Sequence, residues 1–196
     1  MRDEKKEALR KTLLAWRGAL DPAWRASANA AAVAHLLSHA WLGQAERVAL
    51  YCAIRGELDP APLLAPLWQM GKILYLPRLE AGASQIRFAR HQQGEVWQRG
   101  PFGIPQPGPD RAQIEPGAVD LMLVPLVGFD AQGGRLGYGG GFYDRTLAGQ
   151  RPKLLVGLGF AGQQVEHLPR ADHDIPLDAV VTETGWCFFG EGYGTR

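Results

Sequence analysis

The chain has 196 residues, 46% of them hydrophobic and 21% charged, which is ordinary for a folded globular protein and excludes a disordered or collagen-like chain. Lysine and arginine number 21 against 20 aspartate and glutamate residues, so the net charge of +1 argues against broad electrostatic binding of nucleic acid or acidic membrane. Two cysteines, Cys52 and Cys187, cannot form a disulfide framework, and the N-terminal residues show no signal-peptide pattern. We therefore expect a cytoplasmic protein.

The first half of the chain is predicted to contain three helices and three strands. Apolar residues at helical spacing predict a helix over residues 3–20, with Lys6, Arg10 and Arg17 along its edge. Aspartate–proline pairs are typical of helix starts. They predict one helix that runs from residue 22 to about residue 40 and another that opens at Asp59-Pro60 and is closed by glycine at position 71. Apolar segments predict strands at 47–53, 72–77 and 85–91.

The second half alternates in the same way, after a glycine- and proline-rich segment at 93–118 that we expect to form an ordered excursion or flap. Strands are predicted at 120–129, 153–160 and 178–183. A glycine-rich loop and a short helix that begins near Phe142 separate the first two of these strands. Continuous apolar strands separated by helices are typical of a parallel sheet covered on both faces, and we expect a single α/β domain over 1–196.

The strongest local signal is the segment GGRLGYGGGFYDR at 133–145, which leaves a predicted strand and enters a helix. Such a loop can turn several backbone N–H groups toward an anion, because glycine permits positive φ angles and close approach. Arg135 and Arg145 bracket the loop with positive charge, and Asp144 is placed to hold Mg²⁺ against bound phosphate. A flexible turn is the alternative, but it would not need three consecutive glycines between aromatic residues.

Charged residues outside this loop give weaker signals. Lys6 and Arg10 lie one helical turn apart, and the helical pattern alone favours a solvated basic edge. Glu57 follows a predicted strand, where a ligand contact and an ordinary charge at a helix start explain it equally well. Asp172 and Asp174 precede the last strand, where they could bind a metal or belong to a polar loop.

Three further patterns are better explained by packing. The formal GxGxxG at 157–162 reaches Pro169 too soon for a crossover helix, so we expect tight packing rather than a dinucleotide site. His35 and His39 have a spacing that zinc sites use, but the sequence suggests no third ligand. Cys52 at a strand end is expected to pack or to line a pocket rather than to act as a nucleophile.

Taken together, these segments resemble the 5-formyltetrahydrofolate cyclo-ligase family. The segments that carry the resemblance are KEALRK (6–11), YCAIRGELDP (51–60), LPRL (76–79), GIPQP (103–107), LVPLVGFDAQGGRLGYGGGFYDR (123–145) and HDIPLDAVVTE (173–183). The resemblance implies an α/β fold, a three-layer αβα sandwich with a mainly parallel sheet of the NagB/RpiA/CoA-transferase-like type. It also implies that ATP and Mg²⁺ support cyclisation of 5-formyltetrahydrofolate to 5,10-methenyltetrahydrofolate, with ADP and phosphate released after phosphorylation of the formyl oxygen and attack by N10.

The resemblance also assigns roles to residues. Lys6 and Arg10 would contact ATP phosphates, which reverses the preference for a solvated edge. The nucleotide loop would comprise Arg135, Leu136, Gly137, Tyr138, Gly139, Gly140, Gly141, Phe142 and Tyr143. The folate site would comprise Tyr51, Cys52, Glu57, Phe102, Tyr138, Gly139, Gly140, Gly141 and Phe142. Asp144 and Asp174 would hold Mg²⁺, and the catalytic groups would be Arg135, Tyr143 and Arg145.

Two departures from the family pattern and two alternatives accompany this reading. Gly140 stands where some members carry lysine, and Phe102 where some relatives have tryptophan. A non-catalytic, nucleotide- or RNA-binding paralogue of the same fold is the main alternative, and a sugar-phosphate isomerase or CoA transferase is the other. We expect small-molecule substrates (5-formyltetrahydrofolate and ATP), no nucleic-acid or membrane partner, and a monomer or weak dimer.

Overall fold

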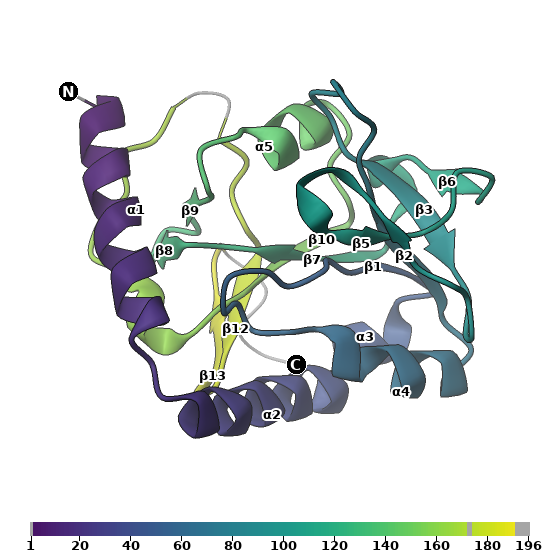
Figure 1. Cartoon of the computed structure of the whole chain (residues 1–196). Coiled ribbons are helices and arrows are strands. Elements are labelled where there is room, and N and C mark those ends of the chain that lie inside the picture. Colours follow the sequence, from purple (N-terminus) through teal and green to yellow (C-terminus); the bar gives the residue numbers. More distant parts are fainter. Residues whose placement is uncertain (1, 172–173, 191–196) are drawn as a thin grey trace.

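The structure is a computed structural model and describes residues 2–171 and 174–190. An eight-stranded sheet runs through its centre (Figure 1). In the order in which neighbours pair, its strands are β13 (Gly185–Phe188), β12 (Ala179–Thr182), β10 (Leu154–Leu158), β7 (Leu121–Pro125), β1 (Arg47–Ala49), β2 (Ile73–Arg78), β3 (Arg87–His91) and β6 (Gln113–Ile114). The five strands from β12 to β2 are parallel, and β13, β3 and β6 add antiparallel edges. The sheet is therefore mainly parallel.

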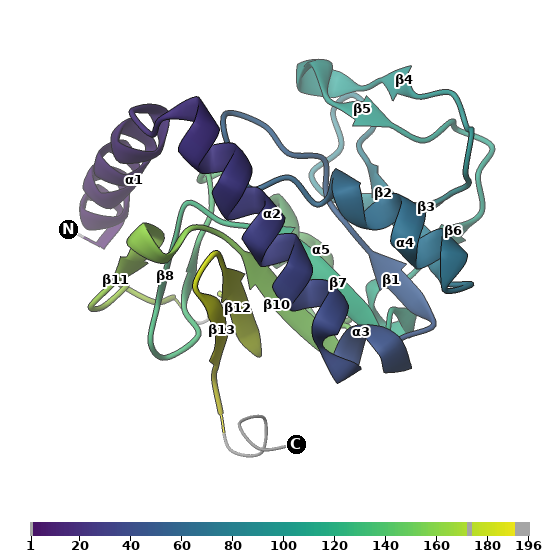
Figure 2. The same cartoon turned by 90° about the horizontal axis from the view of Figure 1, so that it is seen from below.

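Helices cover the sheet unequally on its two faces. The helices are α1 (Arg2–Gly18), α2 (Pro22–Ser38), α3 (Ala40–Gln44), α4 (Leu64–Gln69) and α5 (Phe142–Leu147). Helices α2, α3 and α4 lie against one face, and the short α5 lies on the other with loops around it (Figures 1 and 2). Four short 3₁₀ turns complete the helical segments: η1 (Ala61–Leu63), η2 (Pro101–Gly103), η3 (Pro116–Ala118) and η4 (Ala161–Gln163).

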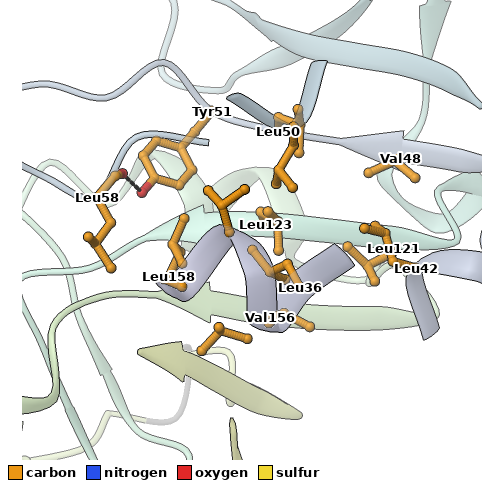
Figure 3. Close-up of a cluster of buried hydrophobic side chains, with 14 of the residues drawn as sticks. Leu36, Leu42, Val48, Leu50, Tyr51, Leu58, Leu121, Leu123, Val156 and Leu158 are labelled. Atoms are coloured by element: carbon orange, nitrogen blue, oxygen red, sulfur yellow. Dashed lines mark hydrogen bonds between the residues drawn. The ribbon is translucent and has the colours of Figure 1, made fainter. Parts of the chain in front are cut away.

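The core on the α2 face is built from side chains of helices and strands at once. Leu36 of α2 and Leu42 of α3 pack against Leu121 and Val156 of the sheet, and all four are buried (Figure 3). Burying one such aliphatic side chain contributes about 1.5–3 kcal/mol. On the opposite face, Leu147 of α5 belongs to a second buried cluster. Continuous apolar strands are thus explained by burial on both faces.

Helix α1 packs at the end of the sheet rather than on either face. Leu13 joins Val127, Leu136 and Leu168 in a third apolar cluster. This cluster lies on a small sheet formed by β11 (Gln164–Val165), β8 (Gly128–Asp130) and β9 (Arg135–Leu136). A Cβ on Gly128 would come within 2.6 Å of Leu13, so glycine lets the helix approach closely. The basic edge of α1 is thereby brought beside the glycine-rich loop.

The single strand predicted at 120–129 is two strands in different sheets. Strand β7 ends at Pro125 and β8 begins at Gly128. The carbonyl of Leu126 accepts hydrogen bonds from Arg17 Nη1 and Gln163 Nε2, both at 3.2 Å, and Gln163 Nε2 also donates to the Val127 carbonyl at 2.8 Å. These side chains replace a neighbouring strand, so the backbone can leave the central sheet at this point without losing its hydrogen bonds.

Other boundaries shift for local reasons. The helix predicted to run to residue 40 ends at Ser38, because His39 is extended and its Nδ1 accepts a hydrogen bond from the backbone of Trp41 at the start of α3. The strands predicted at 47–53 and 153–160 end at Ala49 and Leu158. Segment 93–118 contains a hairpin of β4 (Gln98–Arg99) and β5 (Pro105–Gln106). In the described part of the chain, no helix has the length and apolar character of a membrane span.

Candidate active site

A cavity of about 440 Å³ opens beyond the carboxyl ends of β1, β2 and β7, the usual place for a ligand in an open parallel sheet. It is enclosed by α1, the loop after β1, the β4–β5 hairpin and the glycine-rich loop. The sequence-predicted residues that line it are Lys6, Arg10, Tyr51, Cys52, Glu57, Phe102, Arg135, Leu136, Gly137, Tyr138, Gly139, Gly140, Gly141, Phe142, Tyr143, Asp144 and Asp174. Asp172 lies outside the described residues.

A buried carboxylate fixes the base of the glycine-rich loop. Asp130 accepts hydrogen bonds from the backbone of Gly134 at 2.7 Å and of Leu168 at 3.0 Å, and from Arg170 Nη2 at 3.1 Å. A Cβ on Gly134 would lie 2.8 Å from this carboxylate, so the turn requires glycine. Asp130 therefore ties the start of the loop to the segment that leads toward Asp174.

Helix α1 holds the middle of the loop. Arg10 Nε donates to the carbonyl of Gly137 at 2.8 Å. Gly139 has a φ of +94°, and a Cβ there would lie 3.3 Å from the Arg10 guanidinium. Gly141 also has a positive φ, of +64°, and directly precedes α5. The loop thus takes conformations that glycine favours and keeps its backbone close to a fixed positive charge.

Two ion pairs, each between a basic side chain and a carboxylate, line this part of the cavity. Lys6 Nζ lies 2.6 Å from Asp174 Oδ2, and Arg135 Nη2 lies 2.8 Å from Asp144 Oδ1. The Arg135 side chain is 6% exposed and that of Asp144 24%. An anionic ligand could replace the carboxylates as the partner of Lys6 and Arg135. A divalent cation could likewise replace the basic side chains as the partner of the two carboxylates. Among the residues that the structure describes, no three histidine, cysteine or acidic side chains gather into a complete metal cage.

Arg145 is not among the residues that line the cavity. Its Nε donates to the Ser84 carbonyl at 2.9 Å and its Nη2 to the Gly140 carbonyl at 2.7 Å. Its guanidinium also lies 5.4 Å from the centre of the Phe142 ring. Arg145 therefore braces the glycine-rich loop from outside, unlike the other residues predicted for the site.

The opposite wall is formed by the loop after β1. The Tyr51 hydroxyl donates to the Leu58 carbonyl inside this loop (Figure 3). Burial raises the pKa of the Cys52 thiol to about 12, so Cys52 stays protonated and is a poor nucleophile. Glu57 Oε2 accepts a hydrogen bond from the Ile54 backbone at 2.9 Å, while the buried Oε1 accepts none. A buried acceptor without a partner is unusual and makes Glu57 the most prominent polar group on this wall.

Burial raises the pKa of Glu57 to about 7. The Ile54 backbone N–H, the Arg17 charge, the Tyr138 hydroxyl and the Arg55 charge each lower it, but together they offset only part of the desolvation. Glu57 can therefore gain or lose a proton near neutral pH. Burial also raises the pKa of Tyr138 to about 12 and that of Tyr143 well above its usual value, so both phenols stay protonated.

Two arginines beside this wall were not predicted as site residues. Arg17 donates to the Tyr138 hydroxyl from within the protein. Arg55 lines the cavity with a φ of +50°, and its guanidinium lies 5.5 Å from the centre of the Tyr138 ring. Arg17 lies two helical turns beyond Arg10, a spacing that could have indicated the same face of α1. No comparable sequence signal marks Arg55.

Phe102 lies at the rim of the cavity. Phe102 has a φ of +60°, is 79% exposed, and places its ring centre 6.4 Å from that of Phe142.

The glycines of the segment 157–162 lie in close contact with neighbouring side chains. A Cβ on Gly157 would lie 2.7 Å from Leu126, and one on Gly162 would lie 2.3 Å from Trp16. Glycines of the formal GxGxxG therefore serve tight packing, as predicted.

Comparisons with known proteins identify the family of the chain. The model of the 5-formyltetrahydrofolate cyclo-ligase family matches residues 2–183. The 5-formyltetrahydrofolate cyclo-ligase of Haemophilus influenzae is 34% identical over 181 residues, covering 90% of this chain and 97% of the relative, and that of Escherichia coli is 38% identical over 171 residues, covering 85% and 93%. The structure of Aquifex aeolicus 5,10-methenyltetrahydrofolate synthetase matches with a TM-score of 0.86 and 34% identity, covering 97% of this chain and 96% of that chain. The chain therefore belongs to the 5-formyltetrahydrofolate cyclo-ligase family.

Proposed function

We propose that this protein uses ATP and Mg²⁺ to cyclise 5-formyltetrahydrofolate to 5,10-methenyltetrahydrofolate, releasing ADP and phosphate. The observation that carries the proposal is a single cavity with two different walls. One wall has a glycine-rich backbone with basic side chains and suits phosphates. The other has the buried Glu57 carboxylate, one oxygen of which accepts no hydrogen bond, and suits a ring with N–H donors. The membership in the family points to the same reaction.

On the nucleotide wall, Lys6, Arg10 and Arg135 would bind the phosphates of ATP together with the backbone of the glycine-rich loop. The donor set fits Mg²⁺, because Asp144 and Asp174 both line the cavity and Mg²⁺ is commonly held by one or two carboxylates plus substrate phosphates. When bound, the ion would neutralise negative charge on those phosphates. Bound phosphates could replace the carboxylates as partners of Lys6 and Arg135, which frees the carboxylates for the ion.

On the folate wall, Glu57 would accept hydrogen bonds from N–H groups of the pterin ring. Tyr51 and Cys52 would line the ring pocket, and Phe102 would cover it from the rim. Such a mostly apolar pocket with a few polar groups is typical of small-molecule sites. The ring would then lie with its formyl group toward the glycine-rich loop, where Tyr138 to Phe142 would contact both substrates.

The chemistry needs positioning more than a nucleophile. The formyl oxygen attacks the γ-phosphorus of ATP and displaces ADP, which converts a poor leaving group into a phosphate ester. N10 of the same folate then attacks the formyl carbon and loses its proton, and the carbon–oxygen bond breaks to release phosphate. Arg135 would stabilise charge on the transferred phosphoryl group, and Tyr143, held protonated by burial and stacked near Arg135, would donate a hydrogen bond. Arg145 would act through the Gly140 carbonyl.

The proposal also covers the domain architecture, the cellular location and the oligomeric state of the enzyme. We propose one domain over 1–196 with the three-layer NagB/RpiA/CoA-transferase-like architecture, which the placement of α2–α4 and α5 on opposite faces of the sheet supports. We also propose a cytoplasmic protein that acts on small molecules as a monomer or weak dimer. The free thiols of Cys52 and Cys187 fit a reducing compartment.

The decisive test is turnover of 5-formyltetrahydrofolate by purified protein with Mg²⁺, with and without ATP, followed by the absorbance of methenyltetrahydrofolate. We expect product only when ATP is present. No product despite measurable ATP binding would favour a non-catalytic paralogue. Product without ATP would favour isomerase- or transferase-type chemistry, and neither product nor ATP binding would overturn the assignment of the glycine-rich loop.

Replacing Gly139 with alanine should impair the use of ATP while the protein remains folded. The positive φ costs about 1 kcal/mol of stability, and the added Cβ also presses on the Arg10 guanidinium. Because a small displacement of a positioning group lowers the reaction rate strongly, we expect kcat/KM for ATP to fall by about 10- to 100-fold. Gly149→Ala is the matched control, since Gly149 has a φ of +76° with no heavy atom within 4 Å of the added Cβ. Equal activity losses in the two variants would contradict the prediction.

A further inference from the structure

Helix α5 and the loop that connects β2 to β3 (residues 79–86, the β2–β3 loop) lie side by side (Figure 1). The loop is mostly exposed, but the residues at its two ends, Leu79 and Ile86, line the cavity. The Ile86 backbone N–H donates to Thr146 Oγ1 on α5 at 2.8 Å. Part of the cavity wall is therefore held by a residue that does not itself line the cavity.

The Thr146 hydroxyl both accepts and donates a hydrogen bond. Its oxygen accepts from Ile86, and its hydrogen is donated to the Phe142 carbonyl at 2.7 Å. Phe142 directly follows the last glycine of the glycine-rich loop and also lines the cavity. Thr146 is buried, so both bonds are shielded from water. One buried hydroxyl thus joins the glycine-rich loop to the β2–β3 loop.

Arg145 adds weaker contacts between the same two segments. Its Nε donates to the Ser84 carbonyl at 2.9 Å and its Nη2 to the Gly140 carbonyl at 2.7 Å. The Arg145 carbonyl in turn accepts from Gln85 Nε2 at 3.0 Å. Arg145 is exposed, so water competes for these bonds. We therefore assign the main link to Thr146.

The other end of the β2–β3 loop is attached to the β4–β5 hairpin. The Leu79 backbone N–H donates to Gln106 Oε1 on β5 at 3.1 Å. Gln106 is buried and lines the cavity, and Phe102 lies between the two strands of the hairpin. The β2–β3 loop therefore connects the hairpin, which we propose to cover the folate, with the glycine-rich loop, which we propose to bind ATP.

We propose that Thr146 is a positioning residue that couples the two substrate sites, so that ATP and 5-formyltetrahydrofolate each favour binding of the other. A ligand on the glycine-rich loop orders Phe142 and, through the Thr146 hydroxyl, the β2–β3 loop. The second substrate then meets a wall that is already ordered. Because the coupling is reciprocal, each ligand changes the affinity for the other by the same factor. This inference rests on the proposed function, since it concerns the two substrates assigned there.

The test is calorimetric binding of 5-formyltetrahydrofolate with and without a saturating non-hydrolysable ATP analogue and Mg²⁺. The ratio of the two dissociation constants measures the coupling. We expect a ratio of about 10 in the wild type and a ratio lower by about 3- to 10-fold in Thr146→Val, the size expected for loss of a buried hydrogen bond. Thr146→Ser keeps the hydroxyl and should keep most of the ratio.

Two further measurements support this test. In the free protein, the Ile86 amide hydrogen should exchange with solvent faster in Thr146→Val than in the wild type, because its acceptor is gone. Equal exchange would overturn the contact from which the inference starts. Arg145→Met should lower the coupling ratio in the same direction, and it decides the question if Thr146→Val does not fold.

The matched control is Thr182→Val. Thr182 is also a buried threonine whose hydroxyl joins two backbone groups, since it donates to the Gly185 carbonyl and accepts from the Thr184 N–H, both at 3.2 Å. It lies on β12 and does not line the cavity, so this variant should keep the wild-type ratio.

The inference and the proposed function can fail separately. A wild-type ratio of one, or an unchanged ratio in Thr146→Val, would overturn the coupling and leave the cyclo-ligase proposal standing if the wild type makes product. If the wild type makes no product with ATP, the proposed reaction fails, and the calorimetric ratio still decides whether the two sites are coupled. An absence of binding for both ligands would overturn both.

Discussion

Replacing Glu57 with glutamine is expected to stabilise the free protein at pH 8 by about 3 kcal/mol while it removes most of the folate turnover. Burial raises the pKa of Glu57 from 4.5 to about 7, so the folded state holds this proton more tightly than the unfolded chain does. The stability that the protonated carboxyl contributes is complete below about pH 4.5 and is lost as pH rises through 7. The amide of glutamine stays neutral at every pH, so the Glu57→Gln variant does not lose this stability as pH rises.

Denaturation by urea at pH 5 and pH 8 measures the effect. The difference in free energy of unfolding between Glu57→Gln and wild type should be small at pH 5 and grow toward pH 8. Glu46→Gln, at an exposed position, is the matched control and should show no pH-dependent difference. A Glu57→Gln variant that is no more stable at pH 8 would contradict the assigned burial cost.

The same variant should lose kcat/KM for 5-formyltetrahydrofolate by about 10- to 100-fold, which corresponds to one hydrogen bond to a charged group. A variant that is more stable but less active would mean that the ionised carboxylate is retained for binding and not for folding. Active sites commonly carry such destabilising groups, and the rest of the fold supplies the compensation. Here the compensation close to Glu57 comes mainly from the Ile54 backbone N–H and from Arg17.

Local signals predicted much of the fold. The aspartate–proline cap places the start of α2 correctly at Pro22, because Asp21 accepts a hydrogen bond from the Trp24 backbone. The glycine-rich loop likewise ends where predicted, with α5 starting at Phe142. Both boundaries depend on residues that are neighbours in sequence, and a sequence pattern can carry that information.

Distant contacts decided what the sequence could not predict. The break between β7 and β8 depends on Gln163 and Arg17, which are 37 and 109 residues away from the Leu126 carbonyl that they contact. The antiparallel edges formed by β3 and β13 were also not predicted, because a short apolar run does not encode the direction of its neighbour. The hydrophobic pattern fixes which residues are buried, and it leaves the pairing open.

The candidate active site shows the same difference between local sequence signals and contacts between distant residues. The residues of the glycine-rich loop come together as the motif predicts, but Arg145 follows Asp144 on α5 and braces the loop from outside the cavity. Successive residues on a helix point about 100° apart, so adjacent motif residues need not face the same ligand. The contact between Arg17 and Tyr138 spans 121 residues and connects two elements that no single motif contains.

Asp144→Asn is expected to abolish turnover that depends on Mg²⁺ and ATP, with kcat lower by about 10³-fold and the fold intact, as loss of a major electrostatic group in phosphoryl transfer would cause. Asparagine keeps the shape of the side chain but cannot hold Mg²⁺ as a carboxylate does, nor form an ion pair with Arg135. The Asp144 side chain is partly exposed, so we expect the stability to fall by only about 1 kcal/mol. Turnover across a series of Mg²⁺ concentrations and unfolding by urea measure the two effects.

A second variant separates the two roles of Asp144. Arg135→Met removes the partner of the ion pair and leaves the carboxylate available for the ion. If Asp144 holds Mg²⁺, Asp144→Asn should raise the Mg²⁺ concentration needed for half-maximal residual activity, and Arg135→Met should leave that concentration unchanged while lowering kcat. If Asp144 serves only to orient Arg135, the two variants should behave alike at every Mg²⁺ concentration. Full activity of Asp144→Asn would exclude both roles, and the metal would then have to be held without this carboxylate.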